Sequence, residues 1–461
     1  MQFEDLSVTK TVAAGDRVPQ AGASAGRPDD LALHVPARLL RACPDCGRMH
    51  YLPDLPEGHA ARCERCDGLL RRSRRNPVDR SLALALCALL LFTIATFTPF
   101  LTMSISGQNV TADLTTGSLE LDQQGFWQLA ALVAATTLIA PVARLLATSY
   151  VLLALRMRRP PRHLASVFRW AARLKPWSMI EVFLLAVLVA YAKLIDMASV
   201  EVGIAVFAFA GVMIATVAAD LVLDPEVVWA AIDRRDRGSE ADAPLGSLEG
   251  AVGCECCGLV SRPRPFEASC PRCGAPLHAR KPNSLNRTWA LVIAAAILYV
   301  PANLYPVMTV ISMGRGAPDT ILSGVVELVH ANMLPLALLV FFASITVPVL
   351  KLVGLVTLLI TTQCRSPARL RDRTQLYRIV DAIGRWSMID VFMLSILVGL
   401  VRLGNLATIE PGLGAISFAS VVVLTMLAAE SFDPRLMWDA AGRNGTPAQH
   451  PPHTSSAGPP S

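Results

Sequence analysis

Eight of the eleven cysteines form four CxxC pairs, which fall into two sets of four. The sets are Cys43, Cys46, Cys63 and Cys66, and then Cys254, Cys257, Cys270 and Cys273. Two such pairs supply four thiolates for one tetrahedral site, the geometry that Zn²⁺ takes in structural sites. We therefore predict two Zn²⁺ sites, each in a zinc-ribbon-like module. Iron bound as in rubredoxin is the alternative metal for four cysteines.

A closed four-cysteine site has no open coordination position, which favours a structural role over a catalytic one. Thiol–disulfide exchange would require a low-pKa pair beside a thioredoxin-like βαβ pattern, and the sequence contains no such pattern. Paired cysteines of this kind indicate metal binding in a reducing compartment.

A second chemical feature is a stretch that occurs twice. Residues 177–183 read WSMIEVF and residues 386–392 read WSMIDVF, at an offset of 209 positions. The offset holds without a gap for roughly fifty residues, which indicates an internal duplication. Each copy places a carboxylate, Glu181 or Asp390, just inside a long apolar run. Ionisable groups in such runs are costly and are therefore candidates for function.

The candidate polar network consists of repeat-related pairs. These are Arg144 with Lys351, Glu181 with Asp390, Lys193 with Arg402, and Ser178 with Ser387. Our preferred interpretation is that each acid faces the helix bundle and pairs with the Arg144 or Lys351 of its own repeat. Alternatively, the acids lie at helix N-termini, where the helix dipole favours them. The long basic side chains could likewise reach the membrane interface by snorkelling.

The elements that position these residues are apolar runs long enough to cross a bilayer, which takes about 20 residues. They cover approximately 81–101, 126–155, 178–199, 203–223, 288–312, 333–362, 387–404 and 412–430. With 53% hydrophobic residues, 17% charged residues and a mean hydropathy of +0.46, the composition is that of a membrane protein. We predict an all-α polytopic membrane protein, a tandem duplication of a cytoplasmic zinc-ribbon module plus four transmembrane helices, with eight spans in total.

The predicted domain boundaries follow from these runs and from the polar segments between them. They are a disordered tail (1–42), module 1 (43–75), four-helix unit 1 (78–230), a linker (231–250), module 2 (251–281), four-helix unit 2 (285–440) and a second disordered tail (441–461).

Basic residues predict the orientation in the membrane. Lys and Arg concentrate before the first and fifth apolar runs and in the segments 156–175 and 363–385, which we predict to be loops. By the positive-inside rule, both termini and both cysteine modules are cytoplasmic. Four spans per repeat make the two halves parallel, related by a pseudo-twofold axis along the membrane normal. The polar stretch 102–124 then lies on the far face, where a partner could dock.

A four-cysteine module followed by four spans, with the WSM-x-[ED]-VF stretch opening the third and the whole arrangement duplicated, resembles the paraquat-inducible protein A family. The resemblance covers about residues 40–440. It implies a multi-pass protein of a bacterial inner membrane that works with a periplasmic MCE-domain partner. It also implies transfer of phospholipid or a similar lipid between the inner and outer membranes.

Three functions remain open at this point. The first is lipid transport, with protonation of the intramembrane acids as a switch. The second is a membrane redox protein with rubredoxin-like iron, and the third is a non-transporting anchor for the periplasmic partner. The chain contains no GxxxxGK[ST] phosphate-binding loop, so it does not hydrolyse nucleotide by that route. We also predict that it is not an enzyme and that it has no nucleotide or nucleic-acid partner.

Overall fold

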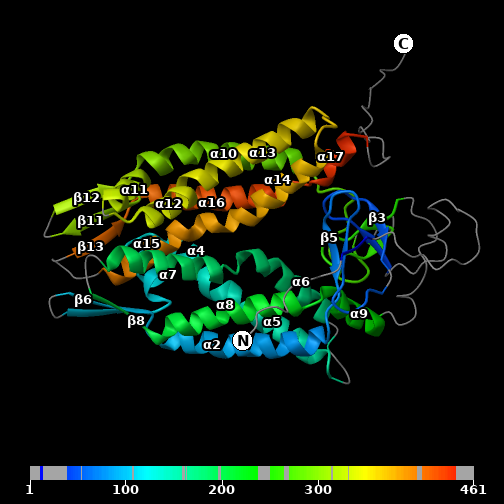
Figure 1. The fold of residues 1–461 in the computed structure, drawn as a ribbon, viewed down its shortest axis with the longest axis horizontal. Coiled ribbons are helices and arrows are strands. Elements are labelled where there is room, and N and C mark those ends of the chain that lie inside the picture. Colours follow the sequence, from blue (N-terminus) through cyan, green and yellow to red (C-terminus); the bar gives the residue numbers. More distant parts are fainter. Residues whose placement is uncertain are drawn as a thin grey trace, which may run out of the picture.

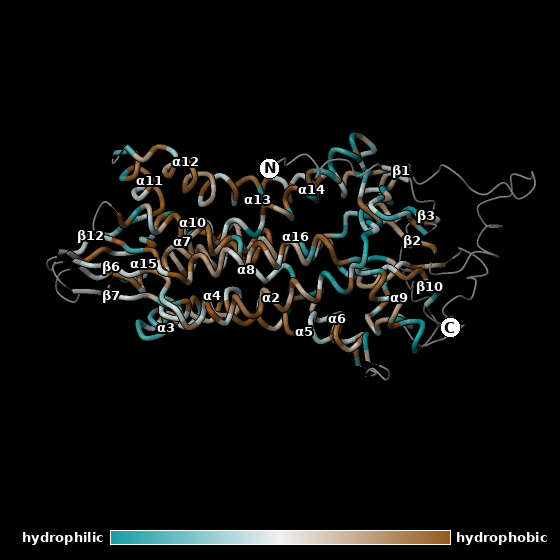
Figure 2. The backbone as a smooth tube through the Cα atoms, turned by 60° about the horizontal axis from the view of Figure 1, so that its bottom comes forward, coloured by the Kyte–Doolittle hydropathy of each residue, from teal (hydrophilic) through white to brown (hydrophobic). Residues whose placement is uncertain are grey.

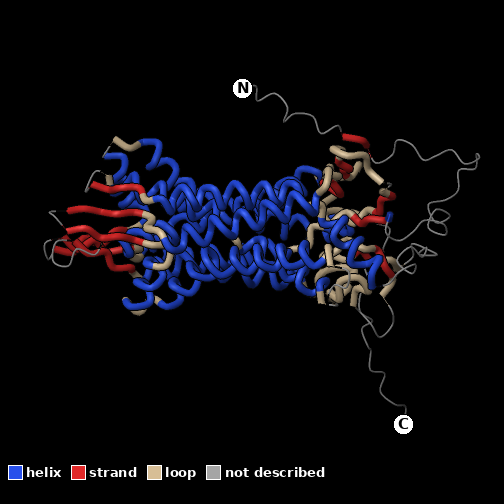
Figure 3. The backbone as a smooth tube through the Cα atoms, turned by 90° about the horizontal axis from the view of Figure 1, so that it is seen from below, coloured by secondary structure: helices blue, strands red, loops and turns tan. Residues whose placement is uncertain are grey.

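The computed structural model describes residues 11–13, 39–52, 54–105, 108–157, 161, 163–195, 199–236, 250–263, 269–312, 315–330, 332–401 and 407–442. The molecule is an elongated helix bundle with strands at both ends (Figure 3). Both cysteine modules lie at the same end of the bundle (Figure 1). Arg402, most of both predicted tails and most of the predicted linker lie outside the described residues.

The predicted eight spans are confirmed, because eight helical segments of the described chain are long and apolar enough to cross a membrane. They are Pro77–Phe97, Trp127–Ala154, Leu164–Leu194, Ile204–Val222, Ser284–Leu304, Leu334–Gln363, Leu370–Leu400 and Leu413–Ser431. Hydrophobic residues predominate along the middle of the bundle and hydrophilic residues at its ends (Figure 2).

The two repeats have matching elements. Unit 1 contains α2 (Pro77–Phe97), β6 (Leu101–Ile105), β7 (Gln108–Ala112), α3 (Thr116–Gln123), α4 (Trp127–Ala134), α5 (Ala140–Ala154), α6 (Leu164–Leu174), α7 (Ile180–Leu194), β8 (Ser199–Val202), α8 (Ile204–Val222) and α9 (Pro225–Asp236). Unit 2 contains α10 (Ser284–Leu304), β11 (Met308–Ser312), β12 (Arg315–Asp319), α11 (Ile321–His330), α12 (Leu334–Phe341), α13 (Val347–Gln363), α14 (Leu370–Ile383), α15 (Ile389–Leu400), β13 (Ala407–Pro411), α16 (Leu413–Ser431) and α17 (Arg435–Ala440).

The second span of each unit contains one π-helical segment, Ala135–Ile139 or Phe342–Thr346. A proline follows each segment, Pro141 or Pro348, and it cannot donate the helical hydrogen bond to the residue four positions earlier. A local widening of the helix accommodates this missing bond. Both repeats therefore place the same irregularity shortly before Arg144 or Lys351.

The basic segments 156–175 and 363–385 were predicted to be loops, and this prediction is wrong for most of their length. They contain α6 and α14, each joined by a 3₁₀ turn to the helix that follows. In α6 the buried residues are Leu164, Phe168 and Ala171, a helical spacing that gives one apolar face. The two arginines of α6, Arg169 and Arg173, lie outside this buried set, and the basic residues of the whole segment led to its prediction as a loop.

The far end of each unit carries a three-stranded antiparallel sheet, ordered β7-β6-β8 in unit 1 and β12-β11-β13 in unit 2. In β6, Leu101 and Met103 are buried while Thr102 and Ser104 are partly exposed, the alternation expected of a strand with one covered face. These short strands were not predicted: β7 lies in the polar stretch 102–124, and β11 lies at the end of the apolar run 288–312.

The two units share one hydrophobic core, which includes residues of α7 and α15. At the contact, the ring of Phe183 meets the ring of Phe392 edge to face, with centroids 5.6 Å apart. These two residues end the two copies of the repeated stretch. Equivalent residues touch each other across a twofold axis, so this pair marks the pseudo-twofold axis between the units.

The cysteine modules are small sheets closed by turns. Module 1 pairs β2 (Leu40–Ala42) with β3 (Met49–Tyr51), and β4 (Ala60–Arg62) with β5 (Leu69–Arg72); β4 also pairs with β1 (Thr11–Ala13). Module 2 pairs β9 (Val252–Gly253) with β10 (Val260–Ser261). The sheets of module 1 therefore include residues 11–13 and 40–42, which lie before residue 43 in the segment predicted to be a disordered tail. The helix α9 extends into the first residues of the predicted linker.

Candidate metal centres and membrane polar groups

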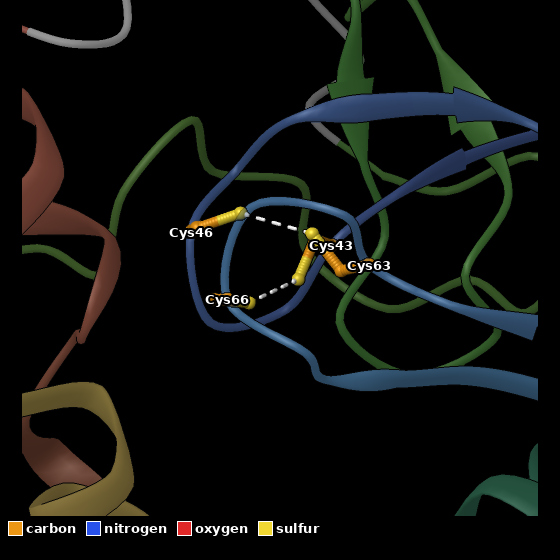
Figure 4. Close-up of side chains that lie close together, drawn as sticks. All are labelled: Cys43, Cys46, Cys63 and Cys66. Atoms are coloured by element: carbon orange, nitrogen blue, oxygen red, sulfur yellow. Dashed lines mark hydrogen bonds between the residues drawn. The ribbon is translucent and has the colours of Figure 1, made fainter. Parts of the chain in front are cut away.

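The four cysteines of module 1 converge on one point. All four are buried, and their sulfur atoms lie within 4.8 Å of one another. The Sγ atoms of Cys43 and Cys66 are 3.5 Å apart, as are those of Cys46 and Cys63 (Figure 4). The predicted ligand set is thus brought together, although the two pairs are separated by sixteen residues in the sequence.

Module 2 reproduces this geometry. The sulfurs of Cys254 and Cys273 are 3.5 Å apart, and so are those of Cys257 and Cys270. The third cysteine of the CECC run, Cys256, lies outside the cluster of four. The ligand assignment made from the CxxC spacing is therefore the one that the fold supports.

Tight turns produce the convergence. In each CxxC pair the first cysteine accepts a hydrogen bond from the residue after the second, as in Gly47 N–H to Cys43 O at 2.9 Å. That following residue has a positive φ in all four turns: Gly47, Asp67, Gly258 and Gly274. Glycine adopts this conformation without steric cost, which explains its place after three of the four pairs.

The donor set fits a tetrahedral metal. Four sulfurs at about 2.3 Å from a zinc ion lie roughly 3.8 Å from one another, close to the separations in both modules. Hydrogen bonds from the neighbouring sulfurs, together with burial, raise the pKa of the Cys43 thiol, whereas the same contacts lower the pKa of Cys63. Four buried thiolates would repel one another without a cation, so the cluster is built for a metal. The donor set does not distinguish zinc from iron.

The modules dock crosswise, each on the unit of the other repeat. Arg378 of α14, in unit 2, donates to the carbonyl of Cys66 at 3.0 Å and pairs with Asp45 at 2.6 Å. Its repeat equivalent Arg169 of α6, in unit 1, donates to the carbonyl of Cys273 at 3.0 Å. Equivalent arginines thus hold the last cysteine of the opposite module.

Apolar packing follows the same crossed arrangement. The cysteines of module 1 belong to a cluster with Leu355 and Trp438 of unit 2, and those of module 2 to a cluster with Phe168 and Trp229 of unit 1. In module 2, Arg272 also pairs with Asp233 of α9 at 3.1 Å. Both clusters couple a metal site to the membrane unit that is distant in sequence.

Sequence reasoning missed several residues around the modules. His50 lies with its Nε2 atom 3.2 Å from the Cys63 sulfur. Arg41 pairs with Glu226 of α9, and burial together with the nearby charge of Arg272 lowers the pKa of Arg41 to about 10. Burial would raise the pKa of Asp433, but the Arg435 guanidinium outweighs it and holds that pKa below its usual range. None of these residues lies in a recognisable motif.

The predicted pairing of Glu181 with Arg144 is wrong. Arg144 forms an ion pair with Asp220 of α8, and Lys175 contacts the same carboxylate at 3.4 Å. Asp220 lies in an apolar run, and its repeat equivalent is Ala429. We predicted only acids that occur in both repeats, so Asp220 was not among the candidates.

The predicted pairing of Asp390 with Lys351 is also wrong. Lys351 is 2% exposed, and its Nζ donates to the hydroxyl of Thr425 at 2.9 Å. A side chain this deeply buried does not snorkel to the interface. The ammonium of Lys351 is satisfied within unit 2 by the fourth span of that unit.

Asp390 is left without a hydrogen-bond partner among the described residues, on both of its carboxylate oxygens. It is 6% exposed and lines a small, mostly apolar cavity between α7 of unit 1 and α11, α12 and α15 of unit 2. Lys193 lines the same cavity from α7, and Ser344 lines it from the π-helical segment. The Ser344 hydroxyl donates to the carbonyl of Val340 at 2.6 Å.

The remaining predicted residues are less constrained. Glu181 is half-buried and has no ion pair within the described part of the chain. Ser178 and Ser387 are buried, and the hydroxyl of Ser387 has no hydrogen-bond partner in the described ranges. The next residue in the first copy, Met179, donates its N–H to the carbonyl of Thr136 at 3.4 Å. This bond ties the repeated stretch to the π-helical segment of the second span.

These features define a class: a duplicated eight-span membrane protein with a four-cysteine module before each four-helix unit. The model of the family described as paraquat-inducible protein A matches residues 78–233 and 285–442. The chain belongs to this family, as its sequence predicted.

Several relatives match most of the chain. The intermembrane transport protein PqiA of Escherichia coli is 33% identical over 86% of this chain and 95% of its own length. The lipophilic envelope-spanning tunnel protein A of the same species is 32% identical over 88% of this chain and 92% of its own length. A probable intermembrane transport protein of Haemophilus influenzae is 28% identical over 87% of this chain and 96% of its own length. No solved structure matches.

Proposed function

We propose that this chain is an inner-membrane component of an envelope lipid transport system. It would pass phospholipid or a similar lipid to or from a periplasmic MCE-domain partner. Family membership and the names of two relatives, an intermembrane transport protein and an envelope-spanning tunnel protein, support this proposal. We expect the chain to transport without acting as an enzyme.

The proposed orientation places both termini and both cysteine modules in the cytoplasm. The basic helices α6 and α14 lie at the module end, as the positive-inside rule requires. The two sheets at the opposite end, β7-β6-β8 of unit 1 and β12-β11-β13 of unit 2, then face the periplasm. Residues 102–124 include β7, an edge strand whose outer backbone groups can pair with a partner.

The observation that carries the proposed mechanism is the unpartnered carboxylate of Asp390 in the cavity between the units. A buried ionised carboxylate without partners is costly, so the neutral acid suits this mostly apolar cavity. Loss of the proton would create a charge that attracts the Lys193 ammonium across the interface between units. We propose that this change in charge shifts the two units between a conformation that receives lipid and a conformation that releases it.

A phospholipid exchange assay tests this function. In the host bacterium lacking the native gene, radiolabelled phospholipid is followed from the inner to the outer membrane. We expect Asp390→Asn to slow exchange at least about tenfold, the scale on which a single functional proton-transfer group acts, and Glu181→Gln to slow it less. Asp372→Asn, which removes an exposed acid of α14, is the matched control and should exchange at the wild-type rate. Full activity of the Glu181→Gln/Asp390→Asn double variant would refute the mechanism.

Zn²⁺ is the metal we propose for both modules, and its measurement separates transport from the redox alternative. Two zinc equivalents per chain without visible absorbance would agree with structural sites. Iron with a visible spectrum would instead support electron transfer through rubredoxin-like centres. If Asp390→Asn has no effect on lipid transport while deletion of residues 102–124 abolishes it, the result would favour the third function, a non-transporting anchor for the periplasmic partner.

A further inference from the structure

A large cavity lies at the module end of the bundle, where both cysteine modules meet both membrane units. Its walls come from β2 and β5 of module 1, from module 2, from the start of α9 in unit 1 and from the start of α17 in unit 2. It is distinct from the Asp390 cavity, with which it shares no residue.

The cavity wall is rich in basic side chains. They are Arg41, Arg71, Arg72, Arg74, Lys281 and Arg435. The carboxylates in the same wall already have basic partners: Asp45 with Arg378, Asp220 with Arg144, Asp224 with Arg71, Glu226 with Arg41, and both Glu255 and Asp433 with Arg435.

Three cations of the wall have no acidic partner among the described residues: Lys281, whose Nζ donates to the carbonyl of Glu430 at 2.6 Å, and the arginines Arg72 and Arg74. Neither Arg72 nor Arg74 forms a hydrogen bond or ion pair with the described residues, and the Nε atom of each is buried without a partner. Both side chains are half-buried. Arg74 also lies close enough to Arg72 for the two charges to repel each other. Buried guanidinium donors without partners are costly, and an anion between them would satisfy both.

The position of the pair indicates which anion fits. Arg72 and Arg74 precede Pro77, the first residue of the first span, so in the proposed orientation they lie at the level of the cytoplasmic headgroups. Leu221, at the end of the fourth span, also lines the cavity and is 54% exposed. The phosphate group of a phospholipid could thus occupy the cavity while the acyl chains of the same lipid lie along the apolar surface of the helix.

We propose that Arg72 and Arg74 bind a phosphate-bearing anion, the headgroup of a phospholipid from the cytoplasmic leaflet. This inference rests on the orientation given under Proposed function and extends it, since it specifies where a lipid headgroup is held. Free inorganic phosphate has the same chemistry and is the other source to be tested. Planar guanidinium groups bind phosphate by paired, charge-assisted hydrogen bonds.

Native mass spectrometry of the purified full chain tests the proposal without any transfer assay. The detergent-solubilised protein is titrated with phosphatidylglycerol, with diacylglycerol, which has the same tails but no phosphate, and with inorganic phosphate alone. The variant is Arg72→Gln/Arg74→Gln. The matched control is Arg75→Gln/Arg80→Gln, which removes the same charge from two exposed arginines of the same segment.

We expect one phosphatidylglycerol to be retained by the wild type and by the control, and binding to fall at least about tenfold in the Arg72→Gln/Arg74→Gln variant. Diacylglycerol should not be retained. Displacement of the lipid by inorganic phosphate would support the site and identify free phosphate as a competing occupant. An equal loss in variant and control would show only diffuse positive charge and would overturn the proposal, as would unchanged binding in the variant.

Two further measurements keep the result interpretable. Metal content reports whether the variant folds, because the ligands Cys63 and Cys66 precede the altered residues within module 1. Arg72→Lys/Arg74→Lys keeps the charges and should retain part of the binding. Since binding is measured without transfer, a failed lipid site leaves the proposed transport function standing, and a failed transport assay leaves the site standing.

Discussion

At the scale of single residues, the ligand cysteines are the features that the sequence predicts best. The CxxC spacing identified all eight cysteines that converge in the two clusters, because the chemistry of a metal site restricts both residue type and separation. Duplication then identified Glu181 and Asp390. It could not identify Asp220 or Thr425 as partners, because a partner is defined by helix packing that the sequence does not display.

Loss of one cysteine ligand should remove one metal and leave the other. Cys66→Ser is expected to halve the metal content measured by inductively coupled plasma mass spectrometry, since four thiolates are needed for a closed site. The thermal unfolding temperature should fall as well, because metal binding contributes to folding. Cys87→Ser, at an exposed cysteine of α2, should keep both metals. Full metal content in Cys66→Ser would contradict the assignment.

The buried ion pair of Asp433 and Arg435 makes a second residue-scale prediction, on acid stability. The Asp433 pKa is lowered in the folded protein, so its stabilisation is present above the unfolded pKa of about 3.9 and is lost as pH falls through the folded pKa. Asp433→Asn should lower the free energy of unfolding at pH 7 by roughly 1.5–3 kcal/mol, because the buried Arg435 loses its hydrogen bonds to the Asp433 carboxylate and keeps only the half-exposed Glu255 as an acidic partner. Its unfolding temperature should also fall less steeply than that of the wild type below pH 4. Parallel pH profiles for both proteins would contradict this account.

At the scale of elements, the apolar spans were predictable and their connections were not. Eight runs of the right length identified the spans because the bilayer fixes the length of a crossing helix. The helices α6 and α14 were missed because the segments that contain them were assigned as loops from their basic charge. The short strands at the far end were missed because four or five residues carry little periodic signal.

The crossed contacts of α6 and α14 predict which module each helix holds. Arg378→Gln should loosen module 1, since it removes the contacts to Asp45 and Cys66, while Arg169→Gln should loosen module 2 through Cys273. Limited proteolysis with mapping of the fragments measures this directly. Cleavage confined to residues 39–75 in Arg378→Gln is expected. Cleavage of module 2 instead would show that each module docks on its own repeat.

At the scale of the whole molecule, the duplication places two equivalent units around one axis. Phe183 and Phe392 meet there, and the Asp390 cavity is built from both units. Sequence analysis predicted parallel repeats but assigned each polar network to a single repeat. Because α7 of the first repeat packs against α15 of the second, Lys193 shares a cavity with Asp390.

The central claim is that protonation of Asp390 couples the two units to lipid transfer. Phospholipid exchange between the membranes is measured with and without a protonophore, in wild type and in Asp390→Asn at equal membrane abundance and metal content. The account predicts that the protonophore slows the wild type and leaves the low residual rate of Asp390→Asn unchanged. An Asp390→Asn variant that exchanges lipid at the wild-type rate and is slowed equally by the protonophore would contradict it.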